Sequence, residues 1–154
     1  MRHFIVLLIA ILTLTLSWAN LTFAASLTDG ENLAAQGDIQ GALTIYQDLA
    51  KQHPDSAETF SHLGGMQLIS QQYPAAIKSF QRAITLGDEG TGTFVGMGMA
   101  YLHMGQHGPA RAAFVEAKQR GVSNPEDIDR VIEWIDKRDG GMAANHPPIG
   151  STTH

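Results

Sequence analysis

A side-chain pattern that returns at one fixed interval, three times over, constrains this chain most. Its clearest members are the small residues Ala42, Ala76 and Ala110, which are evenly spaced. A period of about 34 residues is typical of stacked copies of one helical hairpin, because a single hairpin cannot bury its apolar face alone. The sequence therefore predicts a repeat protein that acts as a binding surface. The other sets at this interval are Gly30, Gly64 and Gly98; Tyr46, Phe80 and Phe114; and Leu49, Ala83 and Ala117.

The repeat divides the chain into three predicted antiparallel helix pairs, followed by a seventh helix. Apolar residues recur at helical spacing in these segments, as at Ile77, Phe80 and Ile84. Turn signals such as Gly37 and Gly105 fall between the two helices of a pair. The six paired helices are predicted over residues 27–36, 39–51, 57–70, 74–85, 93–104 and 109–120.

The seventh helix has the best-marked start in the chain. Asn124 is a favourable N-cap residue, and Pro125 suits the first helical position. One apolar face and one polar face suit the end of a stack, so we expect a capping helix. Residues 139–154, which show no periodicity, are predicted to be a disordered tail behind a repeat domain over residues 25–138. The apolar stripe consists of Ile128, Val131, Ile132 and Ile135, and the polar face of Asp129, Arg130, Glu133, Asp136 and Lys137.

The N-terminal segment has the composition of an export signal. A basic start, Arg2-His3, precedes an apolar run over residues 4–16, and the small residues up to Ala24 resemble a cleavage site. Residues 1–24 are therefore predicted to be a signal peptide. The alternative is an uncleaved N-terminal anchor, because residues 4–25 are just long enough to cross a bilayer.

Composition narrows the class of protein. The 154 residues include no cysteine, which excludes disulfides and thiolate chemistry. An exported protein without disulfides is more typical of a bacterial periplasm than of an animal secretory route. We expect a periplasmic or secreted protein, or in the anchored alternative a membrane protein facing the periplasm. A net charge of −5 without a basic run predicts that nucleic acid is not a partner. No complete catalytic set appears, so we expect no enzyme and no cofactor.

The recurring residues resemble the tetratricopeptide repeat family. The first copy departs from the pattern at Ser26 and Asp29, where the family has large apolar groups. The resemblance covers residues 27–122 and implies an all-α fold, a right-handed α-solenoid of three antiparallel helix pairs plus a capping helix. The second copy carries the pattern at Phe60, Leu63, Gly64, Tyr73, Ala76, Phe80 and Ala83, and the third at Phe94, Met97, Gly98, Tyr101, Gly105, Ala110, Phe114 and Ala117.

In that family, the first helix of each pair lines a concave groove that holds short peptides or partner segments. The corresponding positions here are largely apolar and include no Lys, Arg or Asn, the residues with which some members hold acidic chaperone tails. We therefore expect a hydrophobic or amphipathic segment of a protein or peptide partner. The alternative for Leu68, Ile69 and Leu102 is burial against neighbouring helices. The groove positions are Glu31, Ala34, Ala35, Glu58, Ser61, Gly65, Leu68, Ile69, Val95, Met99, Leu102 and His103.

Two further features have competing interpretations. Trp134 lies off the apolar stripe of the seventh helix, where it is either an exposed interface anchor or packing against the third pair. Met99, His103 and His107 recur at the spacing of one helical turn, and thioether and imidazole groups suit copper. A full ligand set needs more than one adjacent pair, so we predict no metal site at these residues.

The sequence favours an exported interaction module or scaffold that binds a partner segment in an apolar concave groove. By family analogy, such a module would assist the assembly of an envelope complex. Two alternatives remain open at this point: a membrane-tethered assembly factor, and a periplasmic copper-handling protein.

Overall fold

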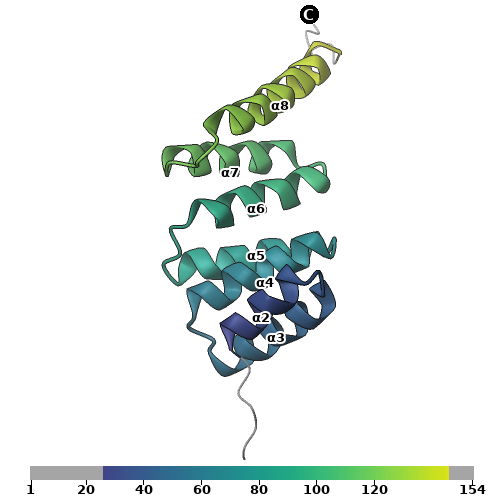
Figure 1. Ribbon diagram of the computed structural model, residues 1–154. Helices are drawn as coiled ribbons and strands as arrows, with labels where there is room; N and C mark the ends of the chain where they lie inside the picture. Colours follow the sequence, from purple (N-terminus) through teal and green to yellow (C-terminus); the bar gives the residue numbers. More distant parts are fainter. Residues whose placement is uncertain (1–25, 146–154) are drawn as a thin grey trace, which may run out of the picture.

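The computed structural model describes residues 26–145 as seven helices, with no strand in that range (Figure 1). Three antiparallel pairs stack one upon another, and α4 and α6 also contact each other directly. The predicted all-α solenoid of three pairs and a capping helix is confirmed. The pairs are α2 (Leu27–Ala35) with α3 (Ile39–Gln52), α4 (Ala57–Ile69) with α5 (Tyr73–Thr85), and α6 (Thr91–His103) with α7 (His107–Gln119), and α8 (Pro125–Asn145) closes the stack.

A ring in the second helix of each pair lies against a glycine in the first helix. A Cβ atom added to that glycine would lie 2.6, 2.6 or 2.8 Å from a ring carbon, closer than a side chain can approach. The three rings are almost completely buried. The contacts are Gly30 with Tyr46, Gly64 with Phe80, and Gly98 with Phe114. Because all three contacts recur with the period of the repeat, one packing unit builds every pair.

Phe80 also packs against the next pair, through Gly96 of α6. A Cβ atom on Gly96 would lie 2.5 Å from Cζ of Phe80. The residue one repeat earlier is His62, whose ring stacks on Tyr46 with 5.2 Å between the centroids. The two junctions between pairs therefore use different contacts, and the glycine within α6 is required by the approach of a ring.

The first helix of each pair is followed by a residue in the left-handed backbone conformation. Gly37 and Gly105 have φ angles of 82° and 68°, which glycine adopts without steric cost. The equivalent position of the second pair holds Gln71, with a φ of 60°. That conformation costs a residue with a Cβ atom about 1–2 kcal/mol.

The two departures from the family pattern, Ser26 and Asp29, form a capping box at the start of α2. The backbone N–H of Asp29 donates to Oγ of Ser26 at 3.2 Å, and the backbone N–H of Ser26 donates to Oδ2 of Asp29 at 2.9 Å. Hydrogen bonds from the side chain and backbone of Ser26 lower the pKa of Asp29. These residues therefore serve helix initiation instead of core packing.

The capping helix α8 keeps the period of the repeat. It begins at Pro125, as predicted, and the starts of α4, α6 and α8 at Ala57, Thr91 and Pro125 are evenly spaced along the chain. Ile128 and Ile135 of its apolar stripe are buried. Thus α8 is the first helix of a fourth repeat, and no second helix follows it within residues 26–145.

Some boundaries differ from the prediction. The predicted tail begins too early, because α8 continues through residues 139–145. The helix continues past two adjacent glycines, which have low helix propensity. Helices α5, α6 and α7 begin one or two residues earlier than expected.

The prolines still stand in the first turn of α5 and α7, where their missing N–H is tolerated.

Residues 1–25, with the predicted signal peptide, and residues 146–154 of the predicted tail lie outside the described residues. None of the helices described is both long and apolar enough to span a membrane.

We predict that Gly96→Ala destabilises the fold by about 1–3 kcal/mol, because the added methyl group overlaps the ring of Phe80. The control is Gly65→Ala in α4, where an added Cβ meets nothing within 4 Å. That variant should gain about 0.5–1 kcal/mol from helix propensity. Urea unfolding followed by circular dichroism measures both, and equal shifts in the two variants would contradict the packing.

We predict that Gln71→Gly stabilises the protein by about 0.5–1 kcal/mol, because relief of the left-handed strain exceeds the entropy that glycine adds to the unfolded chain. Gly105→Ala, at the equivalent position one repeat later, should destabilise it by about 1 kcal/mol. Thermal unfolding compares the two substitutions, and a lower melting temperature for Gln71→Gly would contradict the strain.

Candidate functional site

Helices α4 and α6 line an open cleft of about 450 Å³. None of the residues that line it is a Lys, Arg, Asp or Glu, and most of the side chains are apolar. The cleft is therefore an uncharged, largely apolar surface on the first helices of the second and third pairs. The lining residues are Ser61, His62, Gly65, Met66, Leu68, Ile69, Phe80, Thr91, Gly92, Val95, Gly96, Met99 and Val122.

The structure brings half of the predicted groove positions together in this cleft. Ile69 is 57% exposed, whereas Leu68 is half-buried and packs against the cluster around Phe80 and Ala100. The expectation of a groove and the alternative of burial therefore each describe some of these residues. The positions that line the cleft are Ser61, Gly65, Leu68, Ile69, Val95 and Met99.

The other predicted positions lie outside the cleft lining. Glu31 of α2 is adjacent to it, since its Oε1 lies 3.8 Å from Nε2 of His62. The ring of His103 stacks on Tyr73 with 4.8 Å between centroids, which occupies one face of the imidazole. Leu102 is half-buried and lines a different cleft, toward α8. The remaining positions are Ala34, Ala35 and Glu58.

Residues that sequence reasoning omitted also line the cleft. Gly92 occupies the position equivalent to Glu58 in the next repeat, so the repeat register could have identified it. Val122 follows α7 and lies outside the first helices from which the groove positions were predicted. The lining thus combines a periodic part, which is readable from the sequence, with a contribution from the chain between α7 and α8.

A polar network fixes α4 and α6 relative to each other beside the cleft. Oγ of Ser61 and Oγ1 of Thr93 lie 2.6 Å apart in a hydrogen bond, and Thr93 also donates to the carboxylate of Asp88. The same carboxylate accepts from the backbone N–H of Gly90 at 2.7 Å. Thr93 is buried, so the network ties the loop before α6 to the wall of α4.

Trp134 lies at a second cleft of about 400 Å³, which it lines with Leu102, Val131, Asp127 and Arg130. Its side chain is 47% exposed. The ring of His107 meets it edge-on at 5.7 Å, and the Arg138 guanidinium lies 5.2 Å from its centroid. Trp134 therefore both packs against α7 and leaves nearly half of its surface open to solvent.

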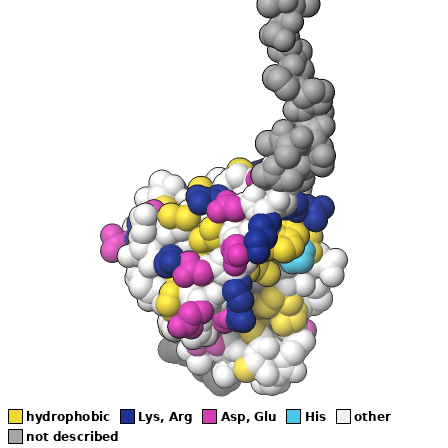
Figure 2. Space-filling view, turned by 90° about the horizontal axis from the view of Figure 1, so that it is seen from above, with side chains coloured by type: hydrophobic (Ala, Val, Ile, Leu, Met, Phe, Trp, Pro, Cys, Tyr) yellow, Lys and Arg dark blue, Asp and Glu magenta, His cyan; other side chains and the backbone are white. Residues whose placement is uncertain are grey.

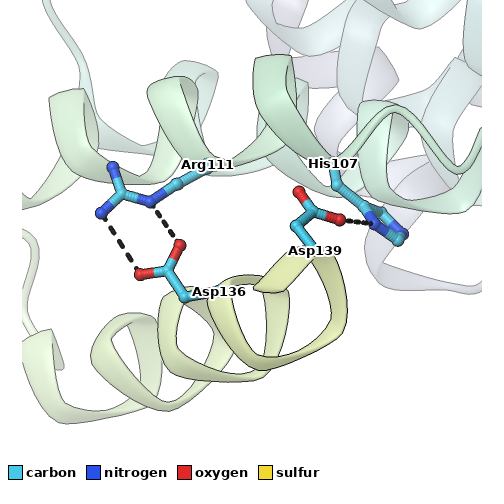
Figure 3. Close-up of polar contacts among 4 residues, drawn as sticks. All are labelled: His107, Arg111, Asp136 and Asp139. Atoms are coloured by element: carbon cyan, nitrogen blue, oxygen red, sulfur yellow. Dashed lines mark hydrogen bonds and ion pairs between the residues drawn. The ribbon is translucent and has the colours of Figure 1, made fainter. Parts of the chain in front are cut away.

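Ion pairs fasten α8 to α7 (Figure 3). Arg111 donates to both oxygens of Asp136, at 2.6 and 3.3 Å, and this carboxylate raises the pKa of Arg111. Nδ1 of His107 lies 2.8 Å from Oδ1 of Asp139. Lys118 pairs with Asp129 at 2.5 Å in the same antiparallel alignment.

Two acidic residues of α8 thus have a different role from the one expected. The sequence predicts that Asp129 and Asp136 belong to the outward polar face, but they form ion pairs with α7 instead. The end of the stack still mixes basic and acidic side chains (Figure 2). Lys137 and Glu133, for example, pair at 2.8 Å along the helix. The polar surface required of a capping helix is therefore present.

The residues considered for copper have separate surroundings. Met99 lines the cleft, His103 stacks on Tyr73, and His107 contacts Asp139. Over the described range, no group of three or more His, Asp and Glu side chains is arranged to hold a metal ion.

A family model described as tetratricopeptide repeat matches residues 30–56, which comprise the larger part of α2, all of α3 and the turn that follows. No protein in a search of curated sequences matches the chain.

Solved structures resemble the whole stack. MamA has a TM-score of 0.69 and 23% identity over 74% of this chain, and the match spans 66% of the MamA chain. SycD, a type III secretion chaperone from Yersinia enterocolitica solved with a peptide of the translocator YopD, has a TM-score of 0.67 and 18% identity over 73% of this chain and 91% of its own. The TPR2B domain of yeast Sti1, in a complex with pHsp70, has a TM-score of 0.65 and 17% identity over 71% and 91%.

At these identities the structural matches establish the fold, and the family model places one repeat in the sequence. The ring-on-glycine contacts extend the same repeat through α4 to α7. The chain therefore has a tetratricopeptide-repeat fold over the described residues, with one tetratricopeptide repeat matched at residues 30–56.

Proposed function

We propose that this protein is an exported, non-enzymatic interaction module that holds an apolar segment of a partner protein in the cleft between α4 and α6. The observation that carries the proposal is a cleft of about 450 Å³ with no charged lining residue. Neighbours with this fold were solved with peptides, as SycD was with a YopD peptide. In this chain, α4 and α6 present an apolar surface to such a ligand.

The side chains in the cleft favour an apolar ligand. Ile69 is mostly exposed, and Val95 and Met99 are half-buried, so a bound segment would remove apolar surface from water. That burial stabilises a complex by about 25 cal/mol per Å² before the costs of association. Methionine adapts its shape to different partners, which suits Met99 to a recognition surface.

Glycines leave room for the ligand backbone. A Cβ atom added to Gly65 or Gly92 would meet no atom of the protein within 4 Å, although both residues line the cleft. The main chain of α4 and α6 is therefore open to close approach at these two points. A helical or extended segment would gain contact there that larger side chains would prevent.

Export and envelope assembly complete the proposal. The basic start, the apolar run over residues 4–16 and the absence of cysteine support a signal peptide and a periplasmic location. A cleft that takes one segment of a larger partner suits a scaffold that assists assembly of an envelope complex. This last step rests on analogy with other members of the fold.

Gly65→Leu should abolish capture of the partner, because its side chain would occupy the cleft, starting from a position where an added Cβ atom meets nothing within 4 Å. The matched control is Gly108→Leu in α7, where an added Cβ also meets nothing but the cleft is not adjacent. Co-purification from the native host after mild crosslinking, with circular dichroism to verify folding, compares the variants. Equal recovery of partners with Gly65→Leu and the wild-type chain would move the binding surface elsewhere.

The exported product should begin near Ala25, as expected for a cleaved signal peptide. Mass spectrometry of the protein recovered from the periplasm measures this directly. A periplasm-facing product that still begins at Met1 and fractionates with membranes would replace the released module with a tethered assembly factor. A product found only in the cytoplasm would contradict export altogether.

A further inference from the structure

The charge on the inner layer of the stack has a single sign. Helices α2, α4 and α6 contain no Lys or Arg, and their carboxylates are Asp29, Glu31 and Glu58. Every Lys and Arg of residues 26–145 lies on α3, α5, α7 or α8, or directly after α7. Asp29 is engaged in the capping box. Glu31 and Glu58 are therefore the carboxylates of these three helices that can interact with a ligand in the cleft.

Both glutamates lie at the α2 side of the cleft, around His62. Glu31 is 3.8 Å from the ring of His62, which lines the cleft and stacks on Tyr46. Glu58 precedes Ser61 and His62 by one turn of α4, so the three share a helix face. Burial raises the pKa of Tyr46, and the negative charges of Glu31 and Glu58 raise it further, which agrees with their convergence on this ring.

The described basic residues do not neutralise this corner. Lys51, Lys118 and Arg111 pair with Asp48, Asp129 and Asp136. Within residues 26–145, no Lys or Arg forms an ion pair with Glu31 or Glu58. The apolar cleft is thus bounded on one side by two exposed carboxylates, which attract a basic group on a ligand and repel an acidic one.

We propose that the occupant of the cleft is a partner segment with an apolar core and Lys or Arg residues at one end, which lie beside Glu31 and Glu58. This inference rests on the proposed function, because it specifies the ligand of the same cleft. The apolar core contacts Ile69, Val95 and Met99, and the basic end sets the orientation of the segment. The same charges weaken the binding of a segment that ends in acidic residues.

Three labelled probe peptides test the inference with the full-length protein. They share one apolar core and carry two Lys, two Ser or two Glu residues at the N-terminal end, with a second series flanked at the C-terminal end. Fluorescence anisotropy should show that a Lys-flanked peptide binds about fivefold more tightly than the Ser-flanked one at low salt, and that the Glu-flanked one binds most weakly. High salt should reduce the Lys advantage, because both carboxylates are exposed and screened.

The double variant Glu31→Gln/Glu58→Gln should remove the difference between the Lys and Ser peptides without weakening the Ser peptide. Its control, Glu126→Gln/Glu133→Gln on α8, changes the net charge equally and should preserve the difference. Equal binding of the Lys and Ser peptides by the wild-type chain would overturn the inference and leave the apolar cleft intact. So would a preference for Lys that survives in the Glu31→Gln/Glu58→Gln variant.

Failure of the proposed function gives a different result. In that case no peptide binds, or Gly65→Leu binds all of them as the wild-type chain does. A second copy of the chain could occupy the cleft instead of a partner segment, and analytical ultracentrifugation tests for it. A concentration-dependent dimer that Gly65→Leu abolishes would assign the cleft to self-association and overturn the inference.

Discussion

The contact between a ring and a glycine is the interaction on which this stack depends. Phe80 shows it most fully, since its ring lies against Gly64 of its own pair and against Gly96 of the next pair. Both contacts are too close for any Cβ atom, so the helices approach along their backbones instead of through interlocking side chains. A single buried ring thereby joins three helices, α4, α5 and α6.

The cleft follows from this arrangement. Because α5 fixes α4 and α6 through Phe80, which itself lines the cleft, the surfaces of α4 and α6 beside this ring remain available for a partner. Gly65 and Gly92 leave the main chain open in the cleft because they have no side chain. The hydrogen bond between Ser61 and Thr93 joins α4 to α6. Basic residues are placed on the other helices, several of them in ion pairs with neighbouring carboxylates. The inner layer is therefore apolar with an acidic border.

Much of this architecture is predictable because the repeat period and the sizes of the recurring side chains follow from how the helices pack. The pairing of Gly64 with Phe80 recurs at Gly98 and Phe114, so the helices, their order and most groove positions can be derived from the register. Gly96 could not be interpreted in this way, since His62 stands one repeat earlier and makes a different contact. The sequence alone does not reveal that the ring of Phe80 contacts Gly96, whereas the ring of Tyr46 contacts His62.

The charged residues were also harder to assign. Asp129 and Asp136 lie on the polar side of an amphipathic helix, and periodicity alone cannot tell a solvated carboxylate from one paired with the preceding helix. Two adjacent glycines favour an earlier end of α8 than the structure has, because glycine has low helix propensity. Local patterns thus identified the elements, whereas the contacts between elements required the structure.

Nuclear Overhauser spectroscopy on the isotope-labelled protein tests the central claim most directly, because it reports proton pairs in close contact. The account predicts strong cross-peaks from the Hα protons of Gly64 and Gly96 to the same Phe80 ring, and from Gly98 to Phe114. Cross-peaks from Phe80 to Gly64 without any to Gly96 would show that successive pairs do not nest. The apolar cleft between α4 and α6 would then lose its structural basis.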